Sequence, residues 1–362
     1  MGEIMDTEER LKLIEEVGEE LITKEEILEL LSKKQHFIAY DGFEPSGRIH
    51  IAQGLVRAIN VNKMVKAGAT FKMLVADWHG WANNKMDGDL DKIQTVGKYF
   101  IEVWKASGMD LKHVEFVWAS ELLNNREYWK TVMQIARKAT LKRVLRTTQI
   151  MGRSESDSLQ ASQIIYPCMQ AADIYHLRAD ICQLGMDQRK VNVMAREIGP
   201  EIGLYKPIIV SHHMLMGLAQ PASDSLDPVE KSISMKMSKS KPDTSVFMTD
   251  SEADIVRKLG KAYCPEKQSK DNPVLEYYRY IIFERYDTIE IRRPDKFGGN
   301  IGIGSYAELE SKYVNGEIHP LDLKQTASRY INELLIPVRD HFEKDQKAKE
   351  LKAIVESYAV TR

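Results

Sequence analysis

Residues 36–120 determine the fold, because runs typical of strands alternate there with runs typical of amphipathic helices. In order, the five runs are HFIAYDGF (36–43), LVRAINVNKMVKAG (55–68), TFKMLVAD (70–77), DLDKIQTVGKYFIEVWKASG (89–108) and VEFVWAS (114–120). The second and fourth runs end at Gly68 and Gly108, and glycine commonly terminates a helix. Strands separated by helices imply βαβ units, so we expect an α/β fold built on a parallel sheet.

The sequence on either side of this stretch extends the pattern. Residues 7–34 have apolar side chains at helical spacing, and Thr23 followed by Glu26 has capping-box spacing, which predicts a helical segment there. Beyond residue 120, two more short units of the same kind are expected around residues 159–177 and 179–199.

Residues 220–243 break this rhythm with six serines, three prolines and four lysines, a composition typical of a linker or mobile loop. The chain that follows has the pattern of a mostly helical region, interrupted by a glycine-rich turn with short extended pieces at 297–306. We therefore expect two domains, with a boundary near 225–250.

The composition is ordinary for a globular protein: the 362 residues are 43% hydrophobic and 29% charged. Lysine and arginine total 51 against 53 aspartate and glutamate, a net charge of −2. The protein has no global basic field, so any nucleic-acid site must be a local patch.

Cysteine usage and the N-terminus predict the compartment. Cys168, Cys182 and Cys264 are scattered and have no CxxC spacing, which argues against a disulfide framework and a structural zinc site. The acidic, amphipathic N-terminus lacks the basic and apolar regions of a signal peptide, and no apolar run approaches the ~18 residues of a membrane span. We expect a cytoplasmic protein in a reducing compartment, with no membrane association.

Two short motifs could bind phosphate. The turn PSGRIHIAQG (45–54) follows the first expected strand, and His50 there could donate a hydrogen bond to a phosphate oxygen at a helix N-terminus. The lysines of KMSKS (236–240) could clamp a transferring polyphosphate. Taken singly, each motif has a commoner explanation: a structural histidine in the first case and a solvated basic loop in the second.

A third motif places polar groups on one helix face. Tyr166, Gln170 and Asp173 are spaced i, i+4 and i+7, so they share a face that would otherwise be apolar. Such groups must be satisfied by each other or by a ligand. The glycine turn GMDQRK (185–190) follows shortly after. Spacing alone leaves a buried polar cluster and a ligand site equally open.

In combination, the motifs resemble those of class I aminoacyl-tRNA synthetases. The first corresponds to their HIGH signature, with Ala52 and Gln53 in place of glycine and the second histidine, and the second corresponds to KMSKS. YPCMQAADI (166–174) and GMDQRK, together with YDGFEPSG (40–47) and ADWH (76–79), closely resemble the tyrosyl-tRNA synthetases of the archaeal and eukaryotic type.

The resemblance implies an organisation for the chain. An N-terminal helical segment (1–35) precedes a Rossmann-like catalytic domain (36–240), in which residues of about 120–160 form an inserted dimerisation and acceptor-stem segment. A mostly α-helical anticodon-binding domain (241–362) follows. The family commonly works as a homodimer.

The resemblance also implies a reaction, in which L-tyrosine and ATP form tyrosyl-adenylate and tyrosine then passes to tyrosine tRNA. Mg²⁺ arrives with ATP, and no protein metal site is expected. The residues implied to bind tyrosine are Tyr40, Tyr166, Gln170, Asp173 and Gln188. Those implied to bind ATP are Gly47, His50, Gln53, Asp187, Lys236, Met237, Ser238 and Lys239, with His50, Gln53, Lys236 and Lys239 acting in catalysis.

Two regions are expected to contact RNA. Residues 128–154 hold seven basic residues and no acidic one, a patch suited to a phosphate backbone unless acids elsewhere or a second subunit cover it. By the resemblance, Arg153, Arg189 and Lys190 contact the acceptor stem, while Phe297, His319 and Asp322 read the first anticodon base.

Two alternatives remain beside the tyrosine-activating ligase. A tryptophan-specific relative would share the catalytic domain, but Tyr40 and Asp173 argue against it because an indole offers one donor and no acceptor. A synthetase-like RNA-binding or regulatory protein is favoured only by the altered HIGH segment at Ala52 and Gln53. Amino-acid-dependent pyrophosphate exchange distinguishes all three.

Overall fold

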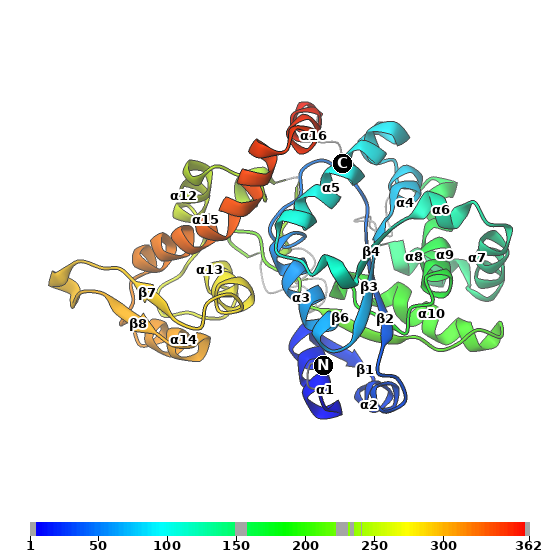
Figure 1. Cartoon of the computed structure of the whole chain (residues 1–362), viewed down its shortest axis with the longest axis horizontal. Coiled ribbons are helices and arrows are strands. Elements are labelled where there is room, and N and C mark those ends of the chain that lie inside the picture. The colour runs from blue at the N-terminus through cyan, green and yellow to red at the C-terminus, as the bar shows by residue number, and fades with distance from the viewer. Residues whose placement is uncertain (1–4, 149–157, 222–230, 232–234, 240, 359–362) are drawn as a thin grey trace.

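The computed structural model describes residues 5–148, 158–221, 231, 235–239 and 241–358. Its main sheet has six strands in the order β1-β6-β5-β2-β3-β4, and all neighbours are parallel except β1 and β6 (Figure 1). The strands are β1 (Gly18–Ile22), β2 (Phe37–Phe43), β3 (Ala69–Val75), β4 (Val114–Trp118), β5 (Ile181–Cys182) and β6 (Ile208–His212). The predicted α/β fold with a parallel sheet is thereby confirmed.

The register aligns the carboxyl ends of the central strands. Strand β2 pairs with β3 from Phe37 opposite Ala69 to Phe43 opposite Val75, and Tyr40 lies opposite Cys182 of β5. In open parallel sheets, ligands bind beyond this edge. The residues that follow β2, β3, β5 and β6 are therefore brought together there.

Helices cover the sheet and build the segment between β4 and β5. They are α1 (Thr7–Val17), α2 (Lys24–Lys33), α3 (Leu55–Lys66), α4 (Asp77–Ala82), η1 (Lys85–Gly88), α5 (Leu90–Ala106), η2 (Leu111–His113), α6 (Ala119–Leu123), α7 (Arg126–Lys138), α8 (Leu141–Thr147), α9 (Ala161–His176), η4 (Met186–Gln188) and α10 (Arg189–Glu201). Helix α5 shows why they form: Asp89 caps its N-terminus by accepting from Lys92 N, and its apolar face is buried.

The prediction of a helical segment at the N-terminus is wrong at one place. Gly18–Ile22 forms the edge strand β1, which pairs antiparallel with β6 and so joins the segment to the main sheet. The strand is short and only partly buried, so tertiary pairing rather than local periodicity defines it. Thr23 caps α2 as predicted, with its hydroxyl accepting from Glu26 N at 3.3 Å. Strand β6 was not predicted, although its IIVS run is rich in β-branched residues.

The C-terminal region is mostly helical, as predicted. Its elements are η5 (Pro242–Thr244), α12 (Glu252–Gly260), α13 (Pro273–Tyr277), the π-helical turn η6 (Tyr278–Ile282), β7 (Ile289–Ile291), η7 (Asp295–Phe297), β8 (Ile301–Ile303), α14 (Tyr306–Val314), α15 (Pro320–Lys344) and α16 (Gln346–Ser357). Helix α16 packs on α5, and one hydrophobic cluster runs through both halves of the chain. No helix in the described ranges combines the length and the apolar character needed to cross a bilayer.

His213 links three parts of the fold. Its ring lies 3.2 Å from Glu19 of β1 and 3.1 Å from Glu276 of α13, and it stacks on Tyr280 of η6 with ring centroids 4.3 Å apart. Burial lowers the pKa of this imidazole, but the two carboxylates outweigh burial and raise the pKa to about 9.

We expect His213→Gln to lower the free energy of unfolding below that of the native chain, and this loss should be larger at neutral pH than at alkaline pH. His213 is charged in the folded protein up to pH 9, whereas an unfolded histidine loses its proton near pH 6.5, so its ion pairs stabilise fully below pH 6.5 and this contribution is lost as the pH rises through 9. The difference in unfolding free energy should be roughly 2 kcal/mol at pH 6.5 and vanish by about pH 10. Urea denaturation of both proteins across this range measures it, and a constant difference would contradict the assignment.

Candidate active site

The predicted site residues converge on one cavity of about 680 Å³, which lies beyond the carboxyl ends of β2, β3, β5 and β6. Those that line it are Tyr40, His50, Gln53, Tyr166, Gln170, Asp173, Asp187, Gln188, Lys236, Met237, Ser238 and Lys239. Gly47 is outside the lining, but its φ of +70° forms the turn that leads to His50.

One end of the cavity can recognise a hydroxyl group. Asp173 of α9 is fully buried; its Oδ1 accepts from the Tyr128 hydroxyl at 2.7 Å, and its Oδ2 lies 2.9 Å from Nε2 of His79. The Tyr40 hydroxyl lies in the same buried region and has no hydrogen-bond partner among the described residues. A buried hydroxyl without a partner beside a carboxylate is suited to a ligand that both donates and accepts.

His79 and Tyr128 hold the carboxylate, and no role had been predicted for either. Burial lowers the pKa of His79, but the Asp173 carboxylate outweighs it and raises the pKa above its usual value. His79 comes from α4 and Tyr128 from α7, so only the tertiary fold brings them to Asp173.

The predicted polar face of α9 continues into the cavity. Gln170 Nε2 donates to Oε1 of Gln188 at 3.0 Å, which links α9 to η4. Tyr166 packs edge-on against the His79 ring, with centroids 5.1 Å apart. The i, i+4, i+7 spacing therefore places Tyr166, Gln170 and Asp173 on one lining wall.

The other end of the cavity contains the histidine turn. Burial first, and then the charges of Lys239 and Lys236, hold the pKa of His50 well below its usual value, so the imidazole is neutral. Its Nδ1 and the side-chain oxygen of Gln53 are buried without partners in the described part of the chain. Gly54 leaves no room for a Cβ, because Met248 packs directly against it.

The two lysines of the KMSKS loop reach this end in different ways. Lys236 Nζ pairs with Asp187 at 2.6 Å. Lys239 Nζ donates to the carbonyl of Ser46 at 3.0 Å and lies 4.5 Å from the centre of the Phe100 ring. Burial, followed by repulsion from Lys85, lowers the pKa of Lys239 to about 7. Both ammonium groups thus border the same space as His50.

A buried polar network fixes the tautomer of His212 at the cavity wall. Arg57 pairs with Asp41 and donates to Gln183 Oε1 at 2.8 Å, so the other amide atom of Gln183 is nitrogen. That nitrogen and Arg57 both approach His212 Nδ1, at 3.0 and 3.2 Å. Since both are donors, Nδ1 accepts and the proton of the neutral ring is on Nε2. Burial raises the pKa of Asp41 to about 6, against the opposing effect of Arg57.

The expected acceptor-stem region is less positive than its sequence indicates. Lys130 pairs with Glu127 at 2.9 Å, Lys138 with Glu201 at 3.2 Å, and Arg143 with Glu197. The acids at 197 and 201 come from α10, which packs beside α7 and α8. Three residues were expected to contact the acceptor stem itself. Arg189 pairs with Glu20 at 2.6 Å, Lys190 is exposed next to it, and Arg153 lies outside the described residues.

The expected anticodon readers lie in two neighbouring segments. His319 caps α15, with Nδ1 accepting from Leu321 N at 3.1 Å, and Asp322 lies in the first turn. Arg293 donates to the carbonyl of Glu317 at 2.7 Å, which ties the chain leading to η7, where Phe297 lies, to the start of α15.

A parallel sheet whose strand ends hold a HIGH-like turn and a KMSKS loop around one cavity defines the class I aminoacyl-tRNA synthetases. A family model described as "tRNA synthetases class I (W and Y)" matches residues 32–336. Tyrosine--tRNA ligase 1, cytoplasmic, of Arabidopsis thaliana is 52% identical over 360 residues, covering 99% of this chain and 90% of the relative. The chain belongs to the tyrosine–tRNA ligase family.

Solved structures agree with this assignment. The tyrosyl-tRNA synthetase of Pyrococcus horikoshii complexed with L-tyrosine superposes with a TM-score of 0.90 at 38% identity, covering 97% of this chain and 100% of that one. The Leishmania major enzyme in complex with tyrosinol has a TM-score of 0.88 at 44% identity over 98% of this chain. The chain spans about half of the Leishmania chain, 52% of its length.

Proposed function

We propose that this chain activates L-tyrosine with ATP and transfers the tyrosyl group to the 3′ end of tyrosine tRNA. The observation that carries this proposal is one cavity with a buried hydroxyl-reading end at Tyr40 and Asp173 and a cationic end at Lys236 and Lys239. An amino acid and a nucleotide can therefore meet in a single cavity, and orientation supplies much of the rate.

At the amino-acid end, the phenol of tyrosine donates to Asp173 and accepts from the Tyr40 hydroxyl. Tyr166, Gln170 and Gln188 hold the ammonium group. Phenylalanine would leave two buried polar groups unpaired, and a site of this kind discriminates by ~10⁴–10⁵-fold. The indole of tryptophan has one donor and no acceptor, so it could donate to Asp173 but would leave the Tyr40 hydroxyl proton without an acceptor.

At the nucleotide end, a tyrosine carboxylate oxygen attacks the α-phosphorus of ATP and the bond to pyrophosphate breaks. Lys236, Lys239 and neutral His50 donate to the phosphate oxygens as negative charge builds on the leaving group. Gly47, Gln53, Asp187, Met237 and Ser238 form the rest of the nucleotide site.

Mg²⁺ enters as the ion that accompanies ATP. In the ranges that the structure describes, no cluster of three or more His, Cys, Asp or Glu side chains could hold a metal. We propose that the phosphate oxygens of the substrate supply ligands for the ion, as is usual for Mg²⁺ at nucleotide sites.

Transfer follows when a terminal ribose hydroxyl of tRNA attacks the tyrosyl carbonyl and AMP leaves. We assign acceptor-stem contacts to Arg153, Arg189 and Lys190, and first-base anticodon contacts to Phe297, His319 and Asp322. With this assignment residues 36–240 are the catalytic domain and 241–362 the anticodon-binding domain. We also propose a cytoplasmic location, which the name of the Arabidopsis relative supports.

The direct test is ATP–pyrophosphate exchange with each of the twenty amino acids separately. Exchange with tyrosine alone is expected. Exchange with tryptophan instead would overturn the roles of Tyr40 and Asp173, and absence of exchange with all twenty would favour an RNA-binding role for the chain.

We expect Asp322→Ala to weaken tRNA charging while leaving tyrosine activation unchanged. A carboxylate that reads a base edge contributes about 1–3 kcal/mol, so kcat/KM for tRNA should fall by roughly 10- to 100-fold. Aminoacylation kinetics measure the loss, and pyrophosphate exchange by the same preparation is the control. An equal loss in both steps would show that Asp322 acts on the fold and reads no base.

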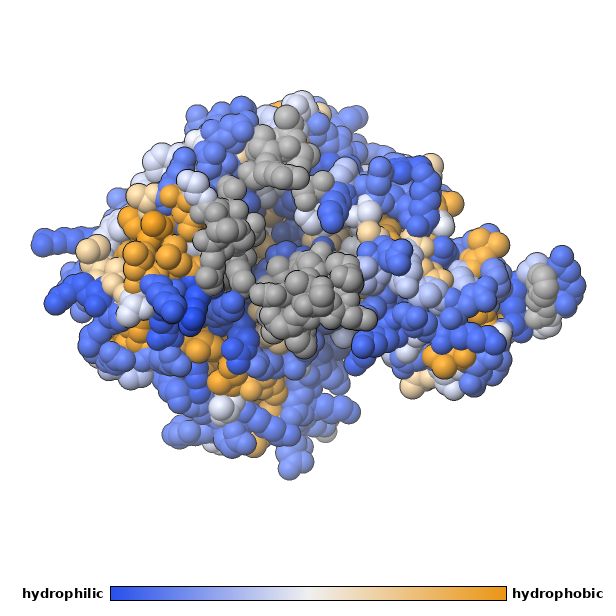
Figure 2. Space-filling model, turned by 180° about the vertical axis from the view of Figure 1, so that it is seen from behind, coloured by the Kyte–Doolittle hydropathy of each residue, from blue (hydrophilic) through white to orange (hydrophobic). Residues whose placement is uncertain are grey.

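We further propose that the protein is a homodimer. Figure 2 shows hydrophobic side chains gathered on the side of the molecule that carries α6 to α9. Large apolar residues exposed on α4, α7, α8 and α9 are Trp81, Trp129, Met133, Leu141 and Ile165. An apolar surface of this kind is typical of a subunit interface.

Met133→Glu is expected to convert the dimer to a monomer. Met133 is 59% exposed on α7, and a carboxylate there would be buried unpaired in the interface. Size-exclusion chromatography with light scattering should give twice the monomer mass for the native chain and the monomer mass for the variant. Val256→Glu is the matched control, since Val256 is 53% exposed on α12, away from this surface. A native monomer would refute the proposal.

A further inference from the structure

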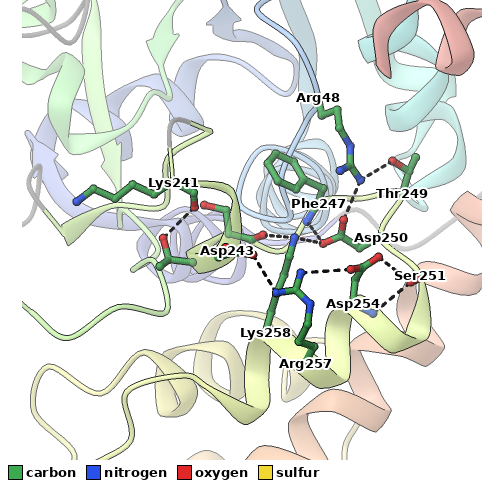
Figure 3. Close-up of polar contacts among 12 residues, drawn as sticks. Arg48, Lys241, Asp243, Phe247, Thr249, Asp250, Ser251, Asp254, Arg257 and Lys258 are labelled. Carbon is green, nitrogen blue, oxygen red and sulfur yellow. Dashed lines mark hydrogen bonds and ion pairs between the residues drawn. The ribbon is translucent and has the colours of Figure 1, made fainter. Parts of the chain in front are cut away.

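A cluster of charges around the buried Asp250 joins the histidine turn to the C-terminal helices (Figure 3). We call it the Asp250 joint: Arg48, Phe247, Asp250 and Lys258. Asp250 is 2% exposed, and its two oxygens accept from Arg48 at 2.8 Å and from Lys258 at 2.6 Å. The two cations also lie over the Phe247 ring, 4.4 and 4.8 Å from its centre.

The joint is bonded to the histidine turn through the backbone. His50 and Phe247 pair as an antiparallel β-bridge. On either side of this bridge, Ile51 N donates to Val246 O at 2.9 Å and Met248 N donates to Ile49 O at 3.0 Å. The Asp250 carboxylate also accepts from Phe247 N at 2.9 Å, so the same group fixes the segment that pairs with His50.

The joint is also bonded to the KMSKS loop. Lys258 Nζ donates to the carbonyl of Ser245 at 2.8 Å, and the Ser245 hydroxyl donates to the carbonyl of Ser238 at 2.7 Å. Ser238 adjoins Lys239, so a chain of two hydrogen bonds leads from the joint to this lysine segment.

The C-terminal helices supply the other side of the joint. Lys258 belongs to α12, and Arg339 of α15 donates to the backbone carbonyl of Asp250 at 3.2 Å. Asp250 therefore lies where both phosphate-binding segments meet the C-terminal region.

Net stability does not explain such a cluster. Burying Lys258 and partly burying Arg48 against one carboxylate costs desolvation, and well-packed apolar residues often stabilise a protein as much or more. The charges instead fix the relative position of the segments that carry them, because each cation must contact both the carboxylate and the aromatic ring.

We propose that Asp250 is a positioning residue for the activation step: it holds the His50 turn and the Ser238–Lys239 segment in register with each other. This inference rests on the proposed function, in which those two segments bind the phosphates of ATP. Asp250 acts only through Arg48, Phe247 and Lys258, and it does not line the cavity.

The test is Asp250→Asn, with tyrosine-dependent pyrophosphate exchange as the readout. A misplacement of about 1 Å can cost about 10²-fold, so we expect kcat/KM for ATP to fall by about that factor. The KM for tyrosine should stay within twofold, because Tyr40 and Asp173 are held by other elements. Asp243→Asn is the matched control, since Asp243 pairs with Arg257 at the surface and its side chain is 80% exposed.

Arg48→Gln is the second variant and keeps the test valid if Asp250→Asn fails to fold. It removes the side-chain link from Asp250 to the histidine turn, keeps the backbone bridge, and leaves the Lys258–Asp250 pair balanced. Folded variants that keep the native kcat/KM for ATP, or that lose tyrosine binding to the same degree, would overturn the inference. Absence of exchange by the native chain would overturn the proposed function as well, which distinguishes the two failures.

Discussion

Asp173→Asn is expected to lower kcat/KM for tyrosine by about 10²-fold or more while leaving that for phenylalanine nearly unchanged. The native carboxylate accepts from Tyr128 on one oxygen and lies beside His79 on the other. In the amide, Tyr128 would retain the oxygen, and the NH₂ group would face the substrate. The phenol would then meet donors from both sides and lose a charged acceptor, which is worth up to about 3 kcal/mol.

Steady-state pyrophosphate exchange with the two amino acids measures this effect. Phenylalanine is the internal control, because it makes no hydrogen bond at this end of the cavity. Discrimination should fall from ~10⁴–10⁵ to about 10²–10³. A parallel loss for both substrates would mean that Asp173 supports the fold and does not read the hydroxyl.

The second large effect is expected at Lys239. Lys239→Met keeps an unbranched apolar side chain but removes the ammonium group, which lies over the Phe100 ring at the phosphate end. Loss of one donor aimed at developing charge costs about 10²–10³-fold in kcat. Tyrosine binding, measured at equilibrium, should not change. Lys241→Met, two residues further along the same loop and exposed, is the control.

The pH dependence gives Lys239 an independent signature. Its pKa of about 7 means that the free protein carries this charge below pH 7 and loses it above. Native kcat/KM for ATP should therefore decline as the pH rises from 7 to 9, since kcat/KM reports the free enzyme. Lys239→Met should lack this decline. If the variant keeps the native pH profile, the decline belongs to another titrating group.

Local patterns predicted the parts of the fold that depend on local physics. The alternation over residues 36–120 identified β2, β3 and β4 because strand-length apolar runs are separated there by helical ones; β2 and β3 are largely buried, whereas the edge strand β4 is only partly buried. Helical spacing placed Tyr166, Gln170 and Asp173 on one wall because all three share α9. Strand β1 was not predicted, because an edge strand of five residues is defined by its pairing with β6 and not by its own sequence pattern.

The supporting residues of the site could not be found in this way. His79 and Tyr128 reach Asp173 from two other helices, and no spacing in the sequence relates them to it. The seven basic residues of 128–154 looked like a patch because the acids that pair with three of them lie outside the counted stretch: Glu127 just before it on α7, and Glu197 and Glu201 on α10. Charge pairing across the fold is invisible to a count along the chain.

The segment at 246–248, which pairs with the histidine turn, has a consequence for how the protein folds during synthesis. Arg48 bonds to Thr249, 201 residues further along the chain, and the backbone on both sides of His50 bonds to the adjoining segment at 246–248. A nascent chain that has emerged only as far as residue 240 still lacks these partners for Ile49 and Ile51. The parallel sheet can therefore form early on the ribosome, whereas the catalytic turn reaches its final shape only after most of the chain has been synthesised.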